Sequence, residues 1–479
     1  MTTGQQGLYG GWRRSTSVGI GSLNTGPTVT LVASIVLPVL LAAVAGPATL
    51  LATGPVGAVL IALVVWRRHG MPVLSYLTGR VRWQLAAMRG ETEYRAPWLP
   101  APQSLDLPGL AAPTRLLAVE DTGRQSTVGL VWNQRTGWMT GTVLLSPAGM
   151  LLAPASTVSS SVAAWGDTLA RMADEDLIRA ASVTIQVTPS SGQAVSDHVA
   201  ERLDPAAPRF AKQTVAELVA RSPRASAQLA AWMSIVVDPS RAPERPTDPA
   251  MAAAETLRAI DSVDLAGTGT DVLRRATPDD VKRLVLGGFR PADMDAPAAQ
   301  IADLVWHEVG PVAATDGYEE YRHDGWISAS WVLREAPRRA VPYDVLLRLI
   351  APGQFTRRVT LAYRVLPTDE AATVVERQIN ATEARAEYRR RTQRTATHRE
   401  RVDAQHAERS AQEEAVGAGM VQWSIYVTTT VSDEEQLPAA RREVEKAARA
   451  AAGLRLRPAF GAQSAALALG LPLGINPLL

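Results

Sequence analysis

The chain has 479 residues, 46% of them apolar and 20% charged, which is enough apolar content to bury a core and to exclude wholesale disorder. Its 49 basic and 47 acidic residues give a net charge of +2, which argues against a dedicated nucleic-acid-binding protein. Because there is no cysteine, disulfides, cysteine-ligated zinc, iron–sulfur clusters and thiol nucleophiles are excluded.

Charge is absent from one long stretch near the N-terminus. From Ser15 through Trp66, a run of 52 residues, there is no Asp, Glu, Lys, Arg or His. Within it, residues 29–66 are nearly all apolar. They would make roughly 57 Å of helix, almost twice the ~30 Å thickness of a bilayer core. Gly46-Pro47 lies near the middle, where a turn would be needed, so the pattern predicts a transmembrane helical hairpin.

The predicted hairpin has spans near residues 28–45 and 49–66, and with its flanks it occupies residues 1–95. Pro38 and Pro55 would kink the two helices, which membrane helices tolerate. A single kinked span and a hairpin that enters the membrane without crossing it are the alternatives. A signal peptide fits less well, because the apolar region is far longer than the usual ~7–15 residues and no small-residue cleavage site follows it.

Arginines flank the hairpin on both sides, whereas its connection carries no charge. Because positive residues favour the cytoplasmic side, both termini and the body after residue 66 are expected in the cytoplasm, attached to the cell (inner or plasma) membrane. The flanking residues are Arg13 and Arg14 before the hairpin and Arg67, Arg68, Arg80, Arg82 and Arg89 after it.

Proline-rich stretches divide the body. Residues 96–114 contain five prolines and are predicted to form an extended tether. A first α/β module is expected at 115–240, and a second proline-rich stretch joins it to a second module at 250–479. Strands alternating with helices, often two strands per helix, predict an α+β fold built of ferredoxin-like modules. No fixed-period repeat is apparent in the sequence.

Periodicity and turn signals predict the individual elements. In the first module we expect strands over 129–146, 181–188 and part of 227–239, and a helix over 161–175. In the second module we expect helices over 251–260, 278–286, 341–350, 368–414 and 434–452, strands over 356–366 and 422–431, and a strand pair that turns at His323-Asp324-Gly325.

No catalytic, cofactor or metal motif is recognisable. A phosphate-binding loop requires a Gly-Lys pair, and the chain has none. Gly267-Thr268-Gly269 is therefore interpreted as a turn, and neither a GxSxG elbow nor an HExxH helix occurs. His307-Glu308 lacks a second histidine, and His398 and His406 are too far apart to chelate one ion. We predict a non-catalytic protein without cofactor, metal or catalytic residues.

Adjacent charges have simpler explanations than a site. Glu319-Glu320 are interpreted as solvated charges, and Asp279-Asp280 as the first turn of a helix that begins after Thr277. The predicted helix at 368–414 carries eight arginines after residue 383, interleaved with acids. It could offer a surface to nucleic acid or anionic lipid. We favour a solvated, ion-paired helix that packs on a neighbouring subunit, which leaves direct nucleic-acid contact open.

Several segments together carry a resemblance to known proteins. They are Tyr9-Gly10-Gly11-Trp12-Arg13-Arg14, Ala163-Ala164-Trp165-Gly166, Trp331 to Pro337, and the ending with Tyr426, a helix from Glu434 to Gly453-Leu454, Phe460, Gln463 and Leu471-Pro472-Leu473-Gly474. Through these segments the chain resembles a family of actinobacterial membrane proteins encoded with conjugative elements. The body also resembles the N-terminal, non-motor domain of type IV secretion conjugation ATPases, in which a similar Leu-Pro-Leu-Gly ending leads into the motor domain.

The resemblance implies a scaffold subunit of a conjugative, type IV secretion-like machine that translocates DNA or protein. Such a subunit would recruit a separately encoded motor ATPase, contact other channel subunits and form a homo-oligomer. The long helix and residues 465–479 would be the docking surfaces, so deletion of residues 460–479 is expected to abolish ATPase recruitment without affecting membrane insertion. An EccE-like component of type VII secretion and a membrane-tethered enzyme of unknown chemistry are the alternatives.

Overall fold

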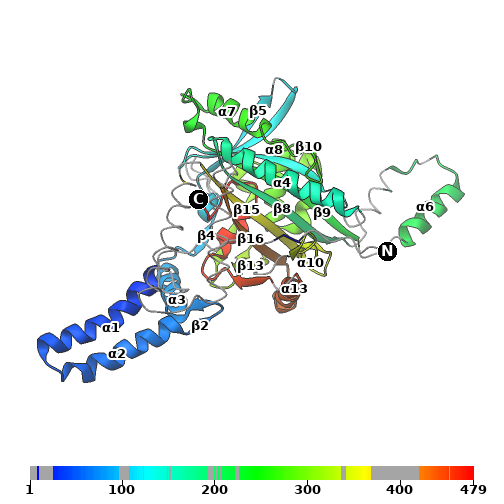
Figure 1. Cartoon of the computed structure of the whole chain (residues 1–479). Coiled ribbons are helices and arrows are strands. Elements are labelled where there is room, and N and C mark those ends of the chain that lie inside the picture. Colours follow the sequence, from blue (N-terminus) through cyan, green and yellow to red (C-terminus); the bar gives the residue numbers. More distant parts are fainter. Residues whose placement is uncertain are drawn as a thin grey trace.

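In the computed structural model, most strands form one large sheet, and helices pack on both of its faces. A pair of apolar helices projects from this body (Figure 1). The structure describes residues 8–9, 25–96, 107–121, 123–147, 149, 153–190, 199, 202–204, 206–221, 226–335, 341–367, 370, 420–451 and 454–479.

The large sheet has 13 strands, and every pairing among the described residues is antiparallel. Eleven strands follow the path β4-β11-β12-β13-β16-β15-β8-β9-β7-β6-β5, while β10 pairs with β7 and β17 with β13. The strands are β4 (Glu93–Arg95), β5 (Thr114–Asp121), β6 (Ser126–Asn133), β7 (Met139–Pro147), β8 (Ile178–Ser190), β9 (Ser226–Val237), β10 (Thr270–Arg275), β11 (Ala313–Asp316), β12 (Tyr321–His323), β13 (Trp326–Glu335), β15 (Thr356–Leu366), β16 (Met420–Val431) and β17 (Arg455–Pro458).

Helices cover the two faces of the sheet differently. One face packs against α4, α7, α10 and α13, and the other against α8, α14, two 3-10 turns and the C-terminal residues. The helices of the body are α4 (Ala155–Asp174), α6 (Arg209–Arg221), α7 (Pro249–Asp261), α8 (Pro278–Phe289), α9 (Ala298–Asp303), α10 (Leu347–Ile350), α13 (Leu437–Ala450) and α14 (Gln463–Leu469), with 3-10 turns η1 (Gly109–Ala111), η3 (Pro239–Arg241), η4 (Pro291–Asp295), η5 (Trp306–Val309) and η6 (Glu434–Gln436).

Two stretches of the chain repeat one order of elements. Among the described residues, both stretches β7-α4-β8-β9-α7-β10 and β13-α10-β15-β16-α13-β17 run strand–helix–strand–strand–helix–strand. The interruptions are short 3-10 turns, α6 between β8 and β9, and the two-residue strand β14 between β13 and α10. In each, the strands lie side by side in the order fourth, first, third, second. The equivalent strands β8 and β15 pair antiparallel at the centre of the sheet (Figure 1), and this pairing relates the two halves by an approximate two-fold axis.

Residues 240–250, where the sequence suggested a connection between two modules, join β9 to α7 in this arrangement. The proline-rich residues there form a short connection in which Asp238 caps η3 and Asp248 caps α7. Two halves can share strand order and topology without sharing a sequence motif. The repeat was therefore not visible in the sequence.

Several predicted elements are confirmed closely. The strand expected at 356–366 is β15, and that expected at 422–431 is β16. The helix expected after Thr277 is α8, where the Thr277 side chain and Asp280 form a reciprocal capping box. Asp324 and Gly325 both have positive φ in the turn between β12 and β13, as a tight hairpin requires.

Other predictions need correction or lie outside the described residues. The helix expected at 341–350 is only the short α10, preceded by the two-residue strand β14 (Val341–Pro342). The tether expected at 96–114 ends in buried structure, because Leu107 and Ala111 are 1% exposed in the core. The long helix expected at 368–414 lies almost entirely outside the described residues.

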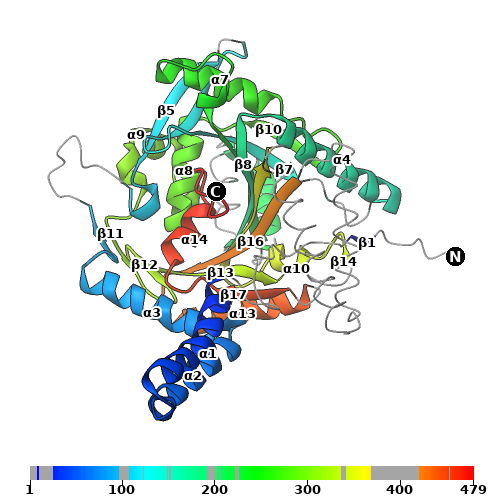
Figure 2. The same ribbon diagram turned by 60° about the vertical axis from the view of Figure 1, so that its left-hand side comes forward.

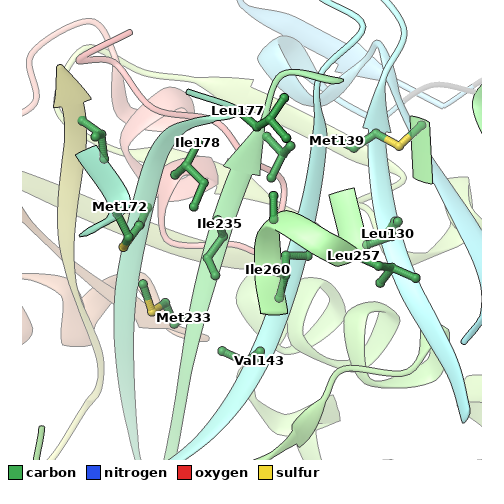
Figure 3. Close-up of a cluster of buried hydrophobic side chains, with 14 of the residues drawn as sticks. Leu130, Met139, Val143, Met172, Leu177, Ile178, Met233, Ile235, Leu257 and Ile260 are labelled. Atoms are coloured by element: carbon green, nitrogen blue, oxygen red, sulfur yellow. The ribbon is translucent and has the colours of Figure 1, made fainter. Parts of the chain in front are cut away.

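The core on the α4 and α7 face is built of aliphatic side chains and methionines. Figure 3 shows Ile260 and Leu257 of α7 lying over strand residues such as Leu130 and Val143. Gly141 of β7 lies directly beneath Ile260, and a Cβ there would be 2.1 Å from Ile260 Cδ1. The absence of a side chain at position 141 therefore lets α7 approach the sheet closely.

The N-terminal apolar stretch forms two antiparallel helices, α1 (Thr25–Ala45) and α2 (Thr49–Val65), joined at Gly46-Pro47 (Figure 1). Their close contact depends on Gly57, since a Cβ there would be 2.6 Å from the Ser34 carbonyl oxygen. Residues 28–45 of α1 are long and apolar enough to cross a membrane, with a mean hydropathy of 2.5, while α2 is a shorter apolar helix.

Candidate functional site

A short amphipathic helix connects the apolar helices to the sheet. After α2, a tight hairpin of β2 (Arg67–Arg68) and β3 (Met71–Pro72) leads into α3 (Val73–Met88), and the chain then forms β4, the edge strand that pairs with β11. Because the same segment ends in the sheet, the body is attached to the apolar helices without a free linker. We call the contact of β2, β3 and α3 with the body the membrane-proximal joint.

Aromatic rings form the centre of the joint. Tyr318, in the loop between β11 and β12, stacks on Phe460 with ring centroids 5.3 Å apart. From α3, Tyr76 meets the edges of both rings at 5.8 and 5.3 Å, and Trp83 meets Tyr318 at 5.7 Å. Each such pair contributes about 0.5–1.5 kcal/mol beyond the burial of its area. The joint therefore ties α3 to the loop that precedes α14.

Polar groups fix the same contact. The Arg80 guanidinium lies 4.6 Å from the centroid of the Tyr318 ring, and the Tyr318 hydroxyl donates to the Tyr76 carbonyl at 3.3 Å. Trp83 Nε1 donates to the carbonyl of Asp316 at 3.0 Å. Burial raises the pKa of the Tyr318 hydroxyl, so this group stays protonated as a donor.

Asp316 connects the joint to α14. Its carboxylate accepts hydrogen bonds from the Ser464 hydroxyl at 2.5 Å and the Ser464 backbone N–H at 3.2 Å, at the first turn of α14. Burial raises the pKa of the Asp316 carboxyl, while these donors oppose the rise. Asp316 thus contacts Trp83 of α3 through its backbone carbonyl and Ser464 of α14 through its carboxylate.

Close backbone packing at the β2–β3 turn completes the joint. His69 and Gly70 both have positive φ there, and the His69 ring lies 5.3 Å from Phe460. A Cβ on Gly70 would lie 1.6 Å from Nε of Arg334 in β13, so only glycine fits.

A second polar feature lies beneath α8 and α14. Arg358 in β15 is 3% exposed, and its Nε donates to Gln186 Oε1 at 3.0 Å. Among the described residues it forms no ion pair, and its Nη1 has no hydrogen-bond partner. Burial lowers the pKa of Arg358 to about 10, so it is still charged at neutral pH. Gly288 and Gly470 leave room for it, because a Cβ on either would lie 2.7–3.1 Å from its side chain.

Hydroxyl groups continue this buried polar layer across the sheet. The pairs Thr184–Thr360, Thr428–Ser330 and Thr430–Ser328 each form a hydrogen bond of 2.9–3.0 Å between neighbouring strands, and His323 Nε2 bonds Ser328 at 2.8 Å. Gln463 of α14 accepts from the Ser330 backbone N–H at 2.8 Å. The hydroxyl pairs connect neighbouring strands, and Gln463 connects α14 to the same layer.

Two of the clefts on the surface of the body contain charged side chains. One, of about 340 Å³, lies between α7, β7 and β10 and includes Asp261, Asp264, Arg124 and Arg275. These charges are used in ion pairs, since Arg124 and Arg275 both contact Asp261. The other, of about 240 Å³, lies at β4, β11 and β12. His323 lines this second cleft and bonds the Ser328 hydroxyl, but both side chains are at most 1% exposed, so the pair is not presented to a substrate.

The charged residues that the sequence analysis considered as possible site residues lie far apart in the structure. Glu308 caps η5 with its carboxylate, and Asp280 caps α8. Glu320 pairs with Arg322 and Arg441 on the surface. Within the described ranges no three His, Asp or Glu side chains gather in a geometry that could hold a metal ion. The membrane-proximal joint was not predicted from the sequence. The one pattern that could have indicated it is the pair Tyr76 and Trp83, seven residues apart and therefore on one side of a helix.

No protein-family model matches this sequence, and no curated protein matches it significantly.

Proposed function

We propose that the chain is a non-catalytic scaffold subunit of a conjugative, type IV secretion-like translocation machine, anchored in the cell membrane by two spans. The observation that carries the proposal is the membrane-proximal joint, which attaches a large sheet to a pair of apolar helices through aromatic, ionic and strand contacts. A subunit that transmits position or force between a membrane and a motor needs such a connection, whereas a tethered enzyme needs only a flexible linker.

The pairing of the N-terminus supports two crossings. Strand β1 (Leu8–Tyr9) pairs with β14 of the body, although α1 and α2 lie between them in the chain. Residues on both sides of the helical pair therefore lie beside the same body. If that body stays on one side of the membrane, the chain crosses an even number of times. The arginines on both flanks favour the cytoplasmic side.

We further propose that each half of the body is a ferredoxin-like module. The strand–helix–strand–strand–helix–strand order, the fourth-first-third-second arrangement and the helices α4 and α7 on one face of the first half support this. The order of β16, α13 and α14 also agrees with the segments through which the chain resembles the non-motor domain of conjugation ATPases.

Within residues 465–479, the segment that the sequence suggested as a docking surface for the motor ATPase, the first part is buried. Leu467, Leu471 and Leu473 are at most 1% exposed and pack with α8, so residues 465–473 belong to the core and offer no free docking face.

The test is a pull-down of the tagged full-length protein from host membranes in mild detergent, with mass spectrometry of the partners and an untagged strain as control. We expect a conjugation-type ATPase together with other channel subunits. An EccC-type motor would transfer the assignment to type VII secretion. A monomer without partners would overturn the scaffold proposal and reopen the membrane-tethered enzyme.

A further inference from the structure

Helix α3 carries an apolar stripe that no described part of the protein covers. Leu77, Val81, Leu85 and Met88 are 42%, 52%, 48% and 83% exposed. They recur at spacings of four, four and three residues, and since an α-helix turns once in 3.6 residues they share one side. Four neighbouring exposed apolar side chains on one helix form a patch, which is typical of an interaction surface.

The opposite side of α3 is already occupied. Tyr76, Arg80 and Trp83 recur at spacings of four and three residues and face Tyr318 in the joint. The body therefore holds one side of α3. This contact fixes the rotation of the helix about its own axis, and with it the direction in which the exposed stripe points.

We propose that this stripe lies in the surface of the membrane, so that α3 is an interfacial helix beside the spans. The membrane is favoured as the partner of this stripe because α3 follows the apolar helix α2 after only the short β2–β3 hairpin, and packs against it. Figure 2 shows α3 lying across the side of the body from which α1 and α2 project. Trp66, 73% exposed at the end of α2, marks the same level, since tryptophan concentrates at membrane interfaces.

Charge favours a bilayer with anionic lipid. Helix α3 contains Arg80 and Arg82 and no acidic residue, and Arg89 follows at its end. Arg82 and Arg89 are exposed at the border of the stripe, where a long side chain can lie along apolar surface and place its guanidinium among lipid phosphates. An amphipathic helix with arginines beside an apolar face is the type that lies in the interface plane.

The experiment uses the full-length chain, which has no native cysteine, so that each introduced cysteine carries the only spin label. Val81→Cys and Leu85→Cys report on the stripe. Leu40→Cys in α1 and Leu273→Cys in β10 are references, because both are exposed apolar residues, 56% and 63%, in the apolar helices and the body. Labelled proteins are reconstituted in vesicles with and without anionic lipid, and collision rates with oxygen and with a water-soluble nickel complex are measured.

We expect the Val81 and Leu85 labels to show an oxygen-to-nickel collision ratio several-fold above that of Leu273, and a further rise with anionic lipid. Arg82→Gln should lower that ratio, whereas Arg135→Gln, an exposed arginine in the β6–β7 turn, should not. Labels as accessible to nickel as Leu273 would overturn the inference, and so would labels shielded from both reagents, which would mean a protein partner. This inference rests on the membrane anchoring proposed above, and the Leu40 label separates the two: Leu40 in lipid with Val81 in water rejects only the interfacial helix.

Discussion

At the scale of single residues, the least expected groups are the charged and polar side chains buried between the sheet and α14. Arg358 is held by one neutral partner, Gln186, so its charge is not compensated by a carboxylate among the described residues. Burial of a cation without a counter-ion opposes stability, so Arg358 costs the fold energy that its single hydrogen bond to Gln186 only partly offsets.

His323 makes the stability of the body depend on pH. Burial lowers its pKa to about 3, helped by the positive charges of Arg358 and Arg290, while an unfolded histidine titrates near 6.5. Between these values the unfolded chain binds a proton that the folded chain does not. Stability therefore falls as the pH is lowered below about 6.5, by about 1.4 kcal/mol per unit.

Replacement of this group by glutamine should remove that dependence. When the pH is lowered from 6.5 to 5, the free energy of unfolding of His323→Gln should fall by about 2 kcal/mol less than that of the wild type. The measurement is denaturant unfolding followed by tryptophan fluorescence at both pH values. His307→Gln, in η5, is the matched control, and parallel curves for wild type and His323→Gln would contradict the argument.

At the scale of elements, the predictions that the structure confirms depend on residues close together in the sequence. The capping box at Thr277 and the turn at Asp324-Gly325 depend on residues three or fewer positions apart, so they could be predicted from the chain alone. The helix predicted at 341–350 was not formed in full, because the β1–β14 pairing takes its first residues. Long-range pairing of that kind leaves no local signal.

The connection between α1 and α2 offers a direct test of the proposed topology. Ala48 is exposed at the turn, at the end of the helical pair far from the body. In the cysteine-free chain, Ala48→Cys should react with a membrane-impermeant maleimide added to intact cells, while Glu91→Cys, after α3, should react only once the membrane is permeabilised. Equal labelling of both sites, or of neither, would contradict two spans.

At the scale of the whole molecule, the C-terminal segment belongs to the core. Residues 460–479 contribute Phe460 to the joint, Gln463 to the buried polar layer and Leu467 to the cluster around α8. Deletion of residues 460–479 is therefore expected to unfold the body, and not to remove ATPase recruitment alone.

A point substitution tests this without removing the segment. Leu467→Ala should destabilise the body by about 2–5 kcal/mol, because it leaves a cavity beneath α8. Leu479→Ala, at a residue 37% exposed, should change stability by less than about 0.5 kcal/mol. Thermal unfolding of both variants in detergent gives the comparison, and a Leu467→Ala protein as stable as Leu479→Ala would show that the segment is only loosely attached.

The apolar N-terminal stretch, the mixture of helices and strands and elements such as β15, β16 and α8 could be predicted from the amino-acid sequence, since hydrophobic periodicity and capping act over a few residues. Only the folded structure shows that the strands join one sheet, that its two halves are related about the β8–β15 pair and that residues such as Leu467 and Leu471 are buried. It also brought Tyr76 and Trp83 to Tyr318 and Phe460. These contacts join residues more than two hundred positions apart, and whether such residues meet depends on how the whole chain packs.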